Sequence, residues 1–107
     1  MKKIEVNQIL KNLNGEDIKG ENKESLTVGK AISNILVMAP TAEGQKMKNF
    51  ALSQRFYNEK GFLEVDDSDF SLIKKIIDAD KFYYTLISGQ LLVILESVQE
   101  STKESKK

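Results

Sequence analysis

LTVGKAISNILVMAP, residues 26–40, is the stretch that decides the fold. Thr27 stands directly before a run of apolar residues at helical spacing, where its hydroxyl can accept a hydrogen bond from the first helical turn. Leu26 precedes that cap and can pack against Ala31. Because proline disfavours helical geometry in the residue before it, the helix must end ahead of Pro40. We therefore expect a helix whose apolar face consists of Val28, Ile32, Ile35, Leu36 and Met38.

Residues 3–18, ahead of this helix, have the pattern of a β-hairpin. Apolar residues alternate along the first strand, and Asn14-Gly15 supplies the positive-φ dipeptide of a tight turn. Ile9 and Leu13 break the alternation, which leaves a bulge, a strand buried on both faces, or a short helical turn open. Residues 19–25 are polar and contain a glycine, so we expect a surface loop there.

Downstream, the chain predicts two helices separated by a short strand. Thr41 is the candidate cap of a helix over residues 42–59, which Gly61 would end as a left-handed C-cap. Residues 62–65 read as a strand. Asp66 and the acids after it favour the positive end of a further helix. The apolar face of that helix consists of Phe70, Ile73, Ile76 and Ile77.

The segment over residues 80–98 fits two structures. Its apolar spacing fits a buried helix capped by Asp80, whereas the two apolar runs around Ser88-Gly89 also fit a second β-hairpin. Periodicity does not separate the two for short apolar runs. We expect the helix and keep a hairpin over 82–98 as the alternative.

The predicted fold class is therefore α+β. An N-terminal β-hairpin and a short strand pack with about four helices in a single small domain over residues 1–98. Residues 99–107 contain no apolar side chain, and we expect a disordered polar tail. The longest apolar runs are far too short to cross a bilayer, and the N-terminus lacks the pattern of a signal peptide, so we expect a cytoplasmic protein.

The amino-acid composition limits the kinds of reaction and metal site that the chain could support. The 107 residues contain no His, Cys or Trp, and Arg55 is the one arginine among 16 basic residues. Histidine and cysteine supply most general acid–base, nucleophilic and transition-metal chemistry, so we expect no catalytic residues, no metal site and no cofactor. Acidic and basic residues balance, which disfavours a nucleic-acid partner. A binding or assembly protein is the favoured class.

Two short motifs resemble known ion or phosphate sites without matching them. Asp66, Asp67 and Asp69 resemble the start of a calcium loop, but the twelfth position holds Ile77 instead of glutamate. Helix capping explains these acids better. Gly29-Lys30 resembles the end of a phosphate-binding loop but lacks its first glycine and its magnesium-binding hydroxyl.

One group of residues could bind a ligand. A helix over 42–59 would carry several cations and an aromatic ring, which together could hold a phosphate and stack on a base. A solvated helix face is the competing interpretation. The candidate ligand-binding residues are Lys46, Lys48, Arg55 and Tyr57.

A second group could form an oligomer interface. Residues 82–95 include ten large apolar or aromatic side chains, and a helix there would be apolar around more than one face. A small domain has few surfaces on which to bury them, so self-association and a central helix inside its own domain both remain open. The candidate interface residues are Tyr84, Leu92 and Leu95.

Several blocks resemble small proteins of unknown function that are encoded by tailed phages and prophages. The blocks are LNGEDI at 13–18, LTVGKAI at 26–32, LEVDDSDF at 63–70 and GQLL at 89–92. The resemblance spans most of residues 1–95. It implies a phage or prophage setting, with the host cytoplasm as the compartment, and it carries over no functional residues.

Two functional hypotheses follow. The first is a non-enzymatic accessory protein that acts by protein–protein interaction and self-association, as an assembly factor, an adaptor or an inhibitor of a host protein. The second is an oligomeric anti-defence sponge that sequesters a nucleotide second messenger without cleaving it. The expected partners are a second copy of the chain, a host or phage protein, and a nucleotide ligand under the second hypothesis.

Overall fold

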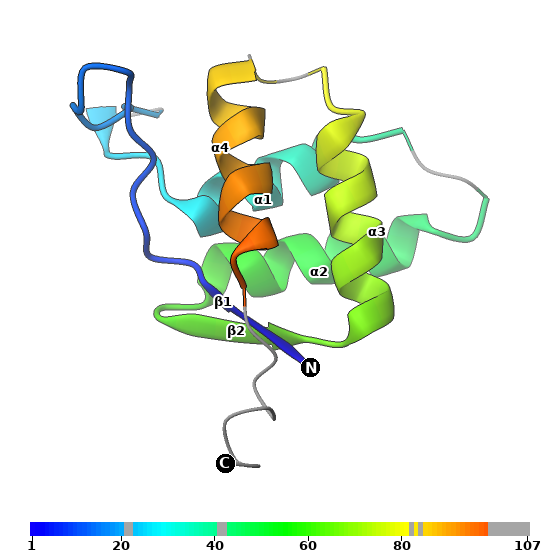
Figure 1. Cartoon of the computed structure of the whole chain (residues 1–107). Helices are drawn as coiled ribbons and strands as arrows, with labels where there is room; N and C mark the ends of the chain where they lie inside the picture. The colour runs from blue at the N-terminus through cyan, green and yellow to red at the C-terminus, as the bar shows by residue number, and fades with distance from the viewer. Residues whose placement is uncertain (21–22, 41–42, 82, 84, 99–107) are drawn as a thin grey trace, which may run out of the picture.

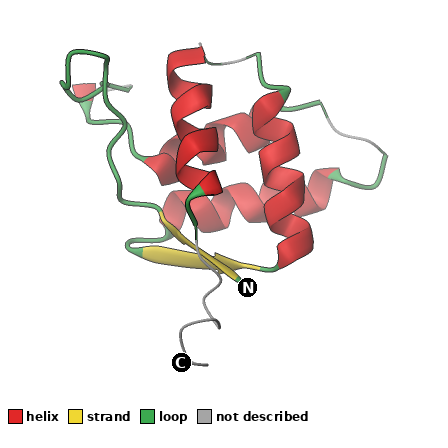
Figure 2. Ribbon diagram, viewed as in Figure 1, coloured by secondary structure: helices red, strands yellow, loops and turns green. Residues whose placement is uncertain are grey.

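The computed structural model describes residues 1–20, 23–40, 43–81, 83 and 85–98. Within them the elements follow the order β1 (Lys2–Glu5), α1 (Val28–Met38), α2 (Lys46–Asn58), β2 (Phe62–Val65), α3 (Asp67–Asp78) and α4 (Thr85–Glu96). The α+β class is confirmed, since the described residues form four helices and one antiparallel two-stranded sheet (Figure 2). The helical interpretation of the last segment is confirmed over Thr85–Glu96, so the second hairpin does not form.

The partner of the first strand differs from the expected one. β1 pairs antiparallel with β2, with Ile4 opposite Leu63, so the strand joins a segment almost sixty residues away. The predicted tight turn still forms, because the Asn12 N–H donates to the Glu16 carbonyl at 2.8 Å and Gly15 has φ +91°. Ile4 needs apolar neighbours on its buried face, and β2 supplies them while the short segment after the turn does not.

The chain between β1 and α1 folds around a ring of three backbone hydrogen bonds. The Leu10 N–H donates to the Leu26 carbonyl, the Leu26 N–H to the Ile18 carbonyl, and the Ile18 N–H to the Leu10 carbonyl, at 2.7 to 2.9 Å. These three buried residues are eight positions apart. The expected loop at 19–25 is therefore attached to the domain at both ends by buried apolar side chains.

An eight-residue repeat underlies this ring. LKNLNGED at 10–17 and IKGENKES at 18–25 share lysine at the second position, asparagine at the fifth and glutamate at the seventh. The sixth position is Gly15 in one copy and Lys23 in the other, and both have positive φ, at 91° and 63°. Each repeat thus supplies one buried apolar residue and one left-handed turn residue.

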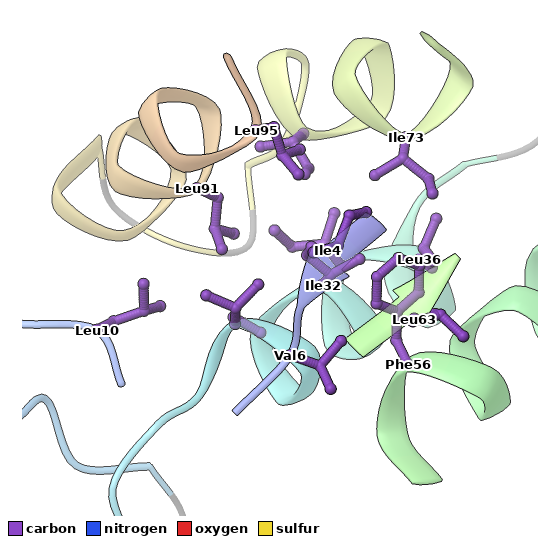
Figure 3. Packing of buried hydrophobic residues seen from close by; sticks show 14 of the residues in the cluster. Ile4, Val6, Leu10, Ile32, Leu36, Phe56, Leu63, Ile73, Leu91 and Leu95 are labelled. Carbon is purple, nitrogen blue, oxygen red and sulfur yellow. The ribbon is translucent and has the colours of Figure 1, made fainter. Parts of the chain in front are cut away.

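α1 is the central helix of the core. Seven of its eleven residues are buried, and it runs antiparallel to α2 (Figure 1). Gly29 permits this contact, since a β-carbon there would lie 2.7 Å from the Phe56 carbonyl oxygen and 2.9 Å from the β-carbon of Val6. The sheet, α3 and α4 supply the other walls of the core, where Ile4, Ile73 and Leu95 gather (Figure 3).

Two predicted helix caps are confirmed. The Thr27 hydroxyl accepts from the Lys30 N–H at 3.2 Å, and an Asp66 carboxylate oxygen accepts from the Asp69 N–H at 2.8 Å. The hydrogen bond from the Asp69 backbone and a second from the Ser68 hydroxyl hold the pKa of Asp66 below its ordinary value. Asp66 is therefore the cap of α3 within the acidic cluster.

The start and end of α2 differ from the expected ones. The helix begins at Lys46 after Gln45, whose side chain makes no capping hydrogen bond, and the expected cap Thr41 lies outside the described residues. At the other end, Glu59 takes the cap position in an extended conformation. Gly61 has φ +141° but is the residue directly before β2, so it shapes the entry to the strand and does not cap the helix.

The two caps should respond differently to pH. Thr27→Ala is expected to cost about 1 kcal/mol at any pH, because a hydroxyl does not titrate in this range. Asp66→Ala should destabilise more at neutral pH than in acid. The folded pKa of Asp66 is lowered, so its contribution is complete above the unfolded pKa and is lost as the pH falls through the folded value.

Urea unfolding at pH 7 and at about pH 3 measures this difference. Asp66→Asn is the matched control, because asparagine caps as well as aspartate but does not titrate. A destabilisation by Asp66→Ala that is equal at both pH values would show that the carboxylate charge has no part in the cap.

Candidate functional site

The four predicted ligand-binding residues do not converge. Lys48 and Arg55 are seven residues apart and share one flank of α2, whereas Lys46 and Tyr57 lie on the opposite flank. Lys48 is also paired, with its Nζ 2.8 Å from Asp69 Oδ1, and this contact raises the pKa of Lys48. A single ligand therefore cannot contact all four side chains.

Arg55 forms a hydrogen bond to the backbone of the sheet. Its guanidinium Nη2 donates to the Glu64 carbonyl oxygen at 2.7 Å, on the edge of β2 that faces away from β1. An edge strand presents unpaired backbone groups, and a covering side chain blocks pairing with another strand. The one arginine thus closes one edge of the two-stranded sheet.

Tyr57 instead contributes to a groove on the other side of α1. The groove has a volume of about 630 Å³ and lies between α1, the second eight-residue repeat and the start of α4. We call it the tyrosine groove, because Tyr57 and Tyr83 both line it. Its remaining lining is Ile18, Lys19, Gly20, Glu24, Ser25, Leu26, Lys30, Asn34, Val37, Met38 and Ile87.

Several polar groups of the tyrosine groove are paired with one another. Lys30 Nζ lies 3.0 Å from Glu24 Oε1, and the hydrogen bond to Glu24 raises the pKa of Lys30, with a smaller contribution from the Tyr57 phenol. The Asn34 side-chain amide donates to the Tyr83 hydroxyl at 2.7 Å. Such a lining offers apolar contact and a few hydrogen bonds, which is the chemistry of binding.

The exposed side of α2 carries a row of large apolar side chains. Met47, Phe50 and Tyr57 are 86%, 59% and 60% exposed, and Gln54 completes the i, i+3, i+7, i+10 spacing. We call these four residues the α2 stripe. Tyr57 belongs to both the stripe and the groove, so the two surfaces meet at its ring. The buried face of α2 is Asn49, Leu52, Ser53 and Phe56.

The spacing of the α2 stripe was already visible in the sequence. The stripe and the buried face each repeat at helical spacing, on opposite sides of one helix, so the helix is apolar on a second side. Sequence periodicity alone could not say which of the two apolar sides faces the core. In the structure the side that bears Phe56 faces the core, because Gly29 lets α1 approach the backbone of α2 there.

Of the predicted interface residues, Leu92 and Leu95 lie on α4, and they differ in how far they are buried. Leu95 is 1% exposed and lies in the core of its own chain, so its side chain is not on a surface. Leu92 is half-buried against that core. Tyr84 lies outside the described residues. The exposed apolar residue of α4 is Val93, at 70%.

Other features of the described residues concern metal binding and a second groove. Among them, no three His, Cys, Asp or Glu side chains are grouped so that they could hold a metal ion. A smaller apolar groove of about 520 Å³ lies between the ends of α1 and α3, lined in part by Met38, Pro40 and Ile76. None of the described helices has both the length and the apolar character needed to cross a membrane.

Comparison with known proteins gives no relative. No protein-family model, no curated protein and no solved structure matches the chain significantly. The resemblance to phage and prophage proteins therefore gains no support from these comparisons, and function must be argued from the surfaces of the chain itself.

Proposed function

We propose that this chain is a non-enzymatic interaction protein, an adaptor or assembly factor that binds an apolar helix of a partner protein and also self-associates. The α2 stripe carries the proposal. Its three large apolar side chains are more than half exposed on one side of one helix. Exposed apolar side chains gathered in this way mark interaction surfaces more often than they occur by chance on a monomer.

The geometry of the α2 stripe favours a helical partner. The stripe runs from residue 47 to residue 57, a length of about 15 Å at the rise of an α-helix. Its i, i+3, i+7 spacing is the spacing with which helices pack along each other. An amphipathic helix of about three turns would cover it, in the manner of helix-in-groove recognition.

Selection of helical peptides on the immobilised protein tests this proposal. We expect enrichment of peptides with apolar residues at i, i+3 or i+4, and i+7, and at least a tenfold loss of their affinity on Phe50→Lys. Phe50 is exposed, so this variant should remain folded. Val93→Lys is the matched control, because Val93 is also exposed, at 70% against 59% for Phe50, but lies on α4.

Two outcomes would overturn the proposal. One is a selection that enriches no peptide family. The other is an equal loss of binding on Phe50→Lys and Val93→Lys, which would mean that the α2 stripe is not the contact surface.

The tyrosine groove favours a second candidate function, the sequestration of a nucleotide. Its volume is in the range of small-molecule sites, and Tyr57 could stack on a base while Lys30 faces a phosphate. A panel of cyclic di- and trinucleotides near a millimolar tests it by thermal shift. A rise in Tm that Tyr57→Ala abolishes would favour this function, and no shift across the panel would reject it.

A further inference from the structure

The two edges of the sheet differ. Arg55 covers part of the edge formed by β2, whereas no described segment pairs with the outer edge of β1. Val6 donates its N–H to the Gly61 carbonyl at 2.8 Å, in the same register that sets Ile4 opposite Leu63. In an antiparallel pair, hydrogen-bonded positions alternate along each strand. The backbone groups of Lys3 and Glu5 therefore point away from β2, toward the outer edge of β1.

The outer edge of β1 is self-complementary in charge. A two-fold axis at Ile4 would pair β1 with β1 of a second copy, setting Lys3 opposite Glu5 of that copy and Glu5 opposite its Lys3. Both pairs would be hydrogen-bonded positions, because these are the residues whose backbone groups face outward. Opposite charges directly across two strands stabilise the pairing.

The neighbouring strand continues the charge pattern. Glu64 of β2 lies opposite Lys3, and Phe62 lies opposite Glu5. All four side chains are on the exposed face of the sheet. Across the joined sheet, Lys3 would therefore stand between its own Glu64 and Glu5 of the second copy, with a negative charge on each side.

We propose that two copies of this chain pair through the outer edges of β1 to form one continuous four-stranded sheet, with Lys3 and Glu5 as the reciprocal contacts. This inference rests on the self-association in the proposed function and names its surface. Arg55 explains why the assembly stops at two copies. Because its guanidinium occupies the Glu64 carbonyl on the edge of β2, pairing of a further strand at that edge is disfavoured.

Charge reversal tests the pairing. Sedimentation velocity over a hundredfold dilution series reaching about 1 mM should show a weak wild-type dimer, since paired four-residue strands bury little area. Lys3→Glu or Glu5→Lys alone should weaken dimerisation at least tenfold, because like charges then face each other. Both side chains are exposed, so circular dichroism should show that each variant remains folded.

The decisive sample is an equimolar mixture of the two variants. One variant carries two acids on the edge and the other carries two lysines, so their mixture should form a heterodimer while each alone stays monomeric. The doubly reversed chain, Lys3→Glu with Glu5→Lys, should dimerise more tightly than either single variant, but less tightly than the wild type because its new acid at position 3 faces Glu64. Failure of both the mixture and the double variant to restore dimers would overturn the pairing.

Further outcomes separate this inference from the proposed function. If Phe50→Lys abolishes the dimer and Lys3→Glu does not, the α2 stripe mediates self-association and the β1 pairing is wrong. If the wild type is monomeric throughout, the self-association fails, while the peptide selection still decides partner binding. If a variant ending at Val98 dimerises and the full chain does not, residues 99–107 occupy the edge and overturn the inference.

Discussion

Gly29→Ala is expected to destabilise the domain by about 3 kcal/mol or more, the upper end of the range for an overfilled core. The added methyl group would lie 2.7 Å from the Phe56 carbonyl oxygen and 3.2 Å from the Val6 carbonyl oxygen. Both obstacles are backbone atoms, so no side chain can rotate to make room. To relieve the contact, α1 would have to move away from α2 and from the chain that follows β1.

Gly89→Ala is the matched control for this prediction. Gly89 also lies inside a helix, but the nearest atom to an added β-carbon is the Thr85 methyl at 3.7 Å. Alanine is favoured over glycine in a helix by about 1 kcal/mol, so this variant should gain stability. Urea unfolding of both variants gives the comparison. A neutral or stabilising Gly29→Ala would mean that α1 and α2 do not approach this closely in solution.

Leu95→Lys should abolish folding, because it places a charge without a partner in the core. Leu95 is 1% exposed and packs in the cluster that includes Ile4 and Ile73. Truncating a buried leucine to alanine costs about 2–5 kcal/mol, and an unpaired charge costs more, against a typical stability of 5–15 kcal/mol. Val93→Lys on the same helix should leave stability nearly unchanged, since Val93 is 70% exposed.

Circular dichroism and size-exclusion chromatography distinguish the two possible roles of Leu95. An interior residue gives a variant that is unfolded or aggregated. A folded monomer obtained from a wild-type dimer would instead place Leu95 at a subunit boundary and contradict its position in the core.

With Leu95 inside the core, the surfaces left for association are elsewhere. The α2 stripe and the outer edge of β1 lie on different elements and differ in chemistry, since one is apolar and the other is charged and hydrogen-bonding. One chain could therefore bind a partner helix through the α2 stripe while its sheet edge pairs with a second copy.

Local features of the fold could be predicted from the sequence. Thr27 and Asp66 cap their helices as expected, and residues 62–65 form the expected strand. Such features depend on residues three or four positions apart, so the chemistry of a short stretch is sufficient. The helix over Thr85–Glu96 was one of two open alternatives, because short apolar runs fit either structure.

The candidate site could be predicted only in part. Of the candidate ligand-binding residues, Tyr57 is exposed, whereas Lys48 and Arg55 are engaged by Asp69 and by the Glu64 carbonyl. Both partners lie in segments that follow α2, and sequence gives no sign of which distant group a surface cation will meet. The eight-residue repeat was visible in the sequence, and its lysine, asparagine and glutamate positions would have revealed it.

The sequence by itself determined where α1 and α3 begin and which residues are apolar. Only the tertiary structure decided which strand β1 joins, which side of α2 faces the core, and which sheet edge is left unpaired by the described residues. The physical reason is that a strand's backbone groups require a partner but do not specify one. That choice was made by the burial of Ile4 against β2 and by the close approach that Gly29 allows, contacts between residues far apart in the chain.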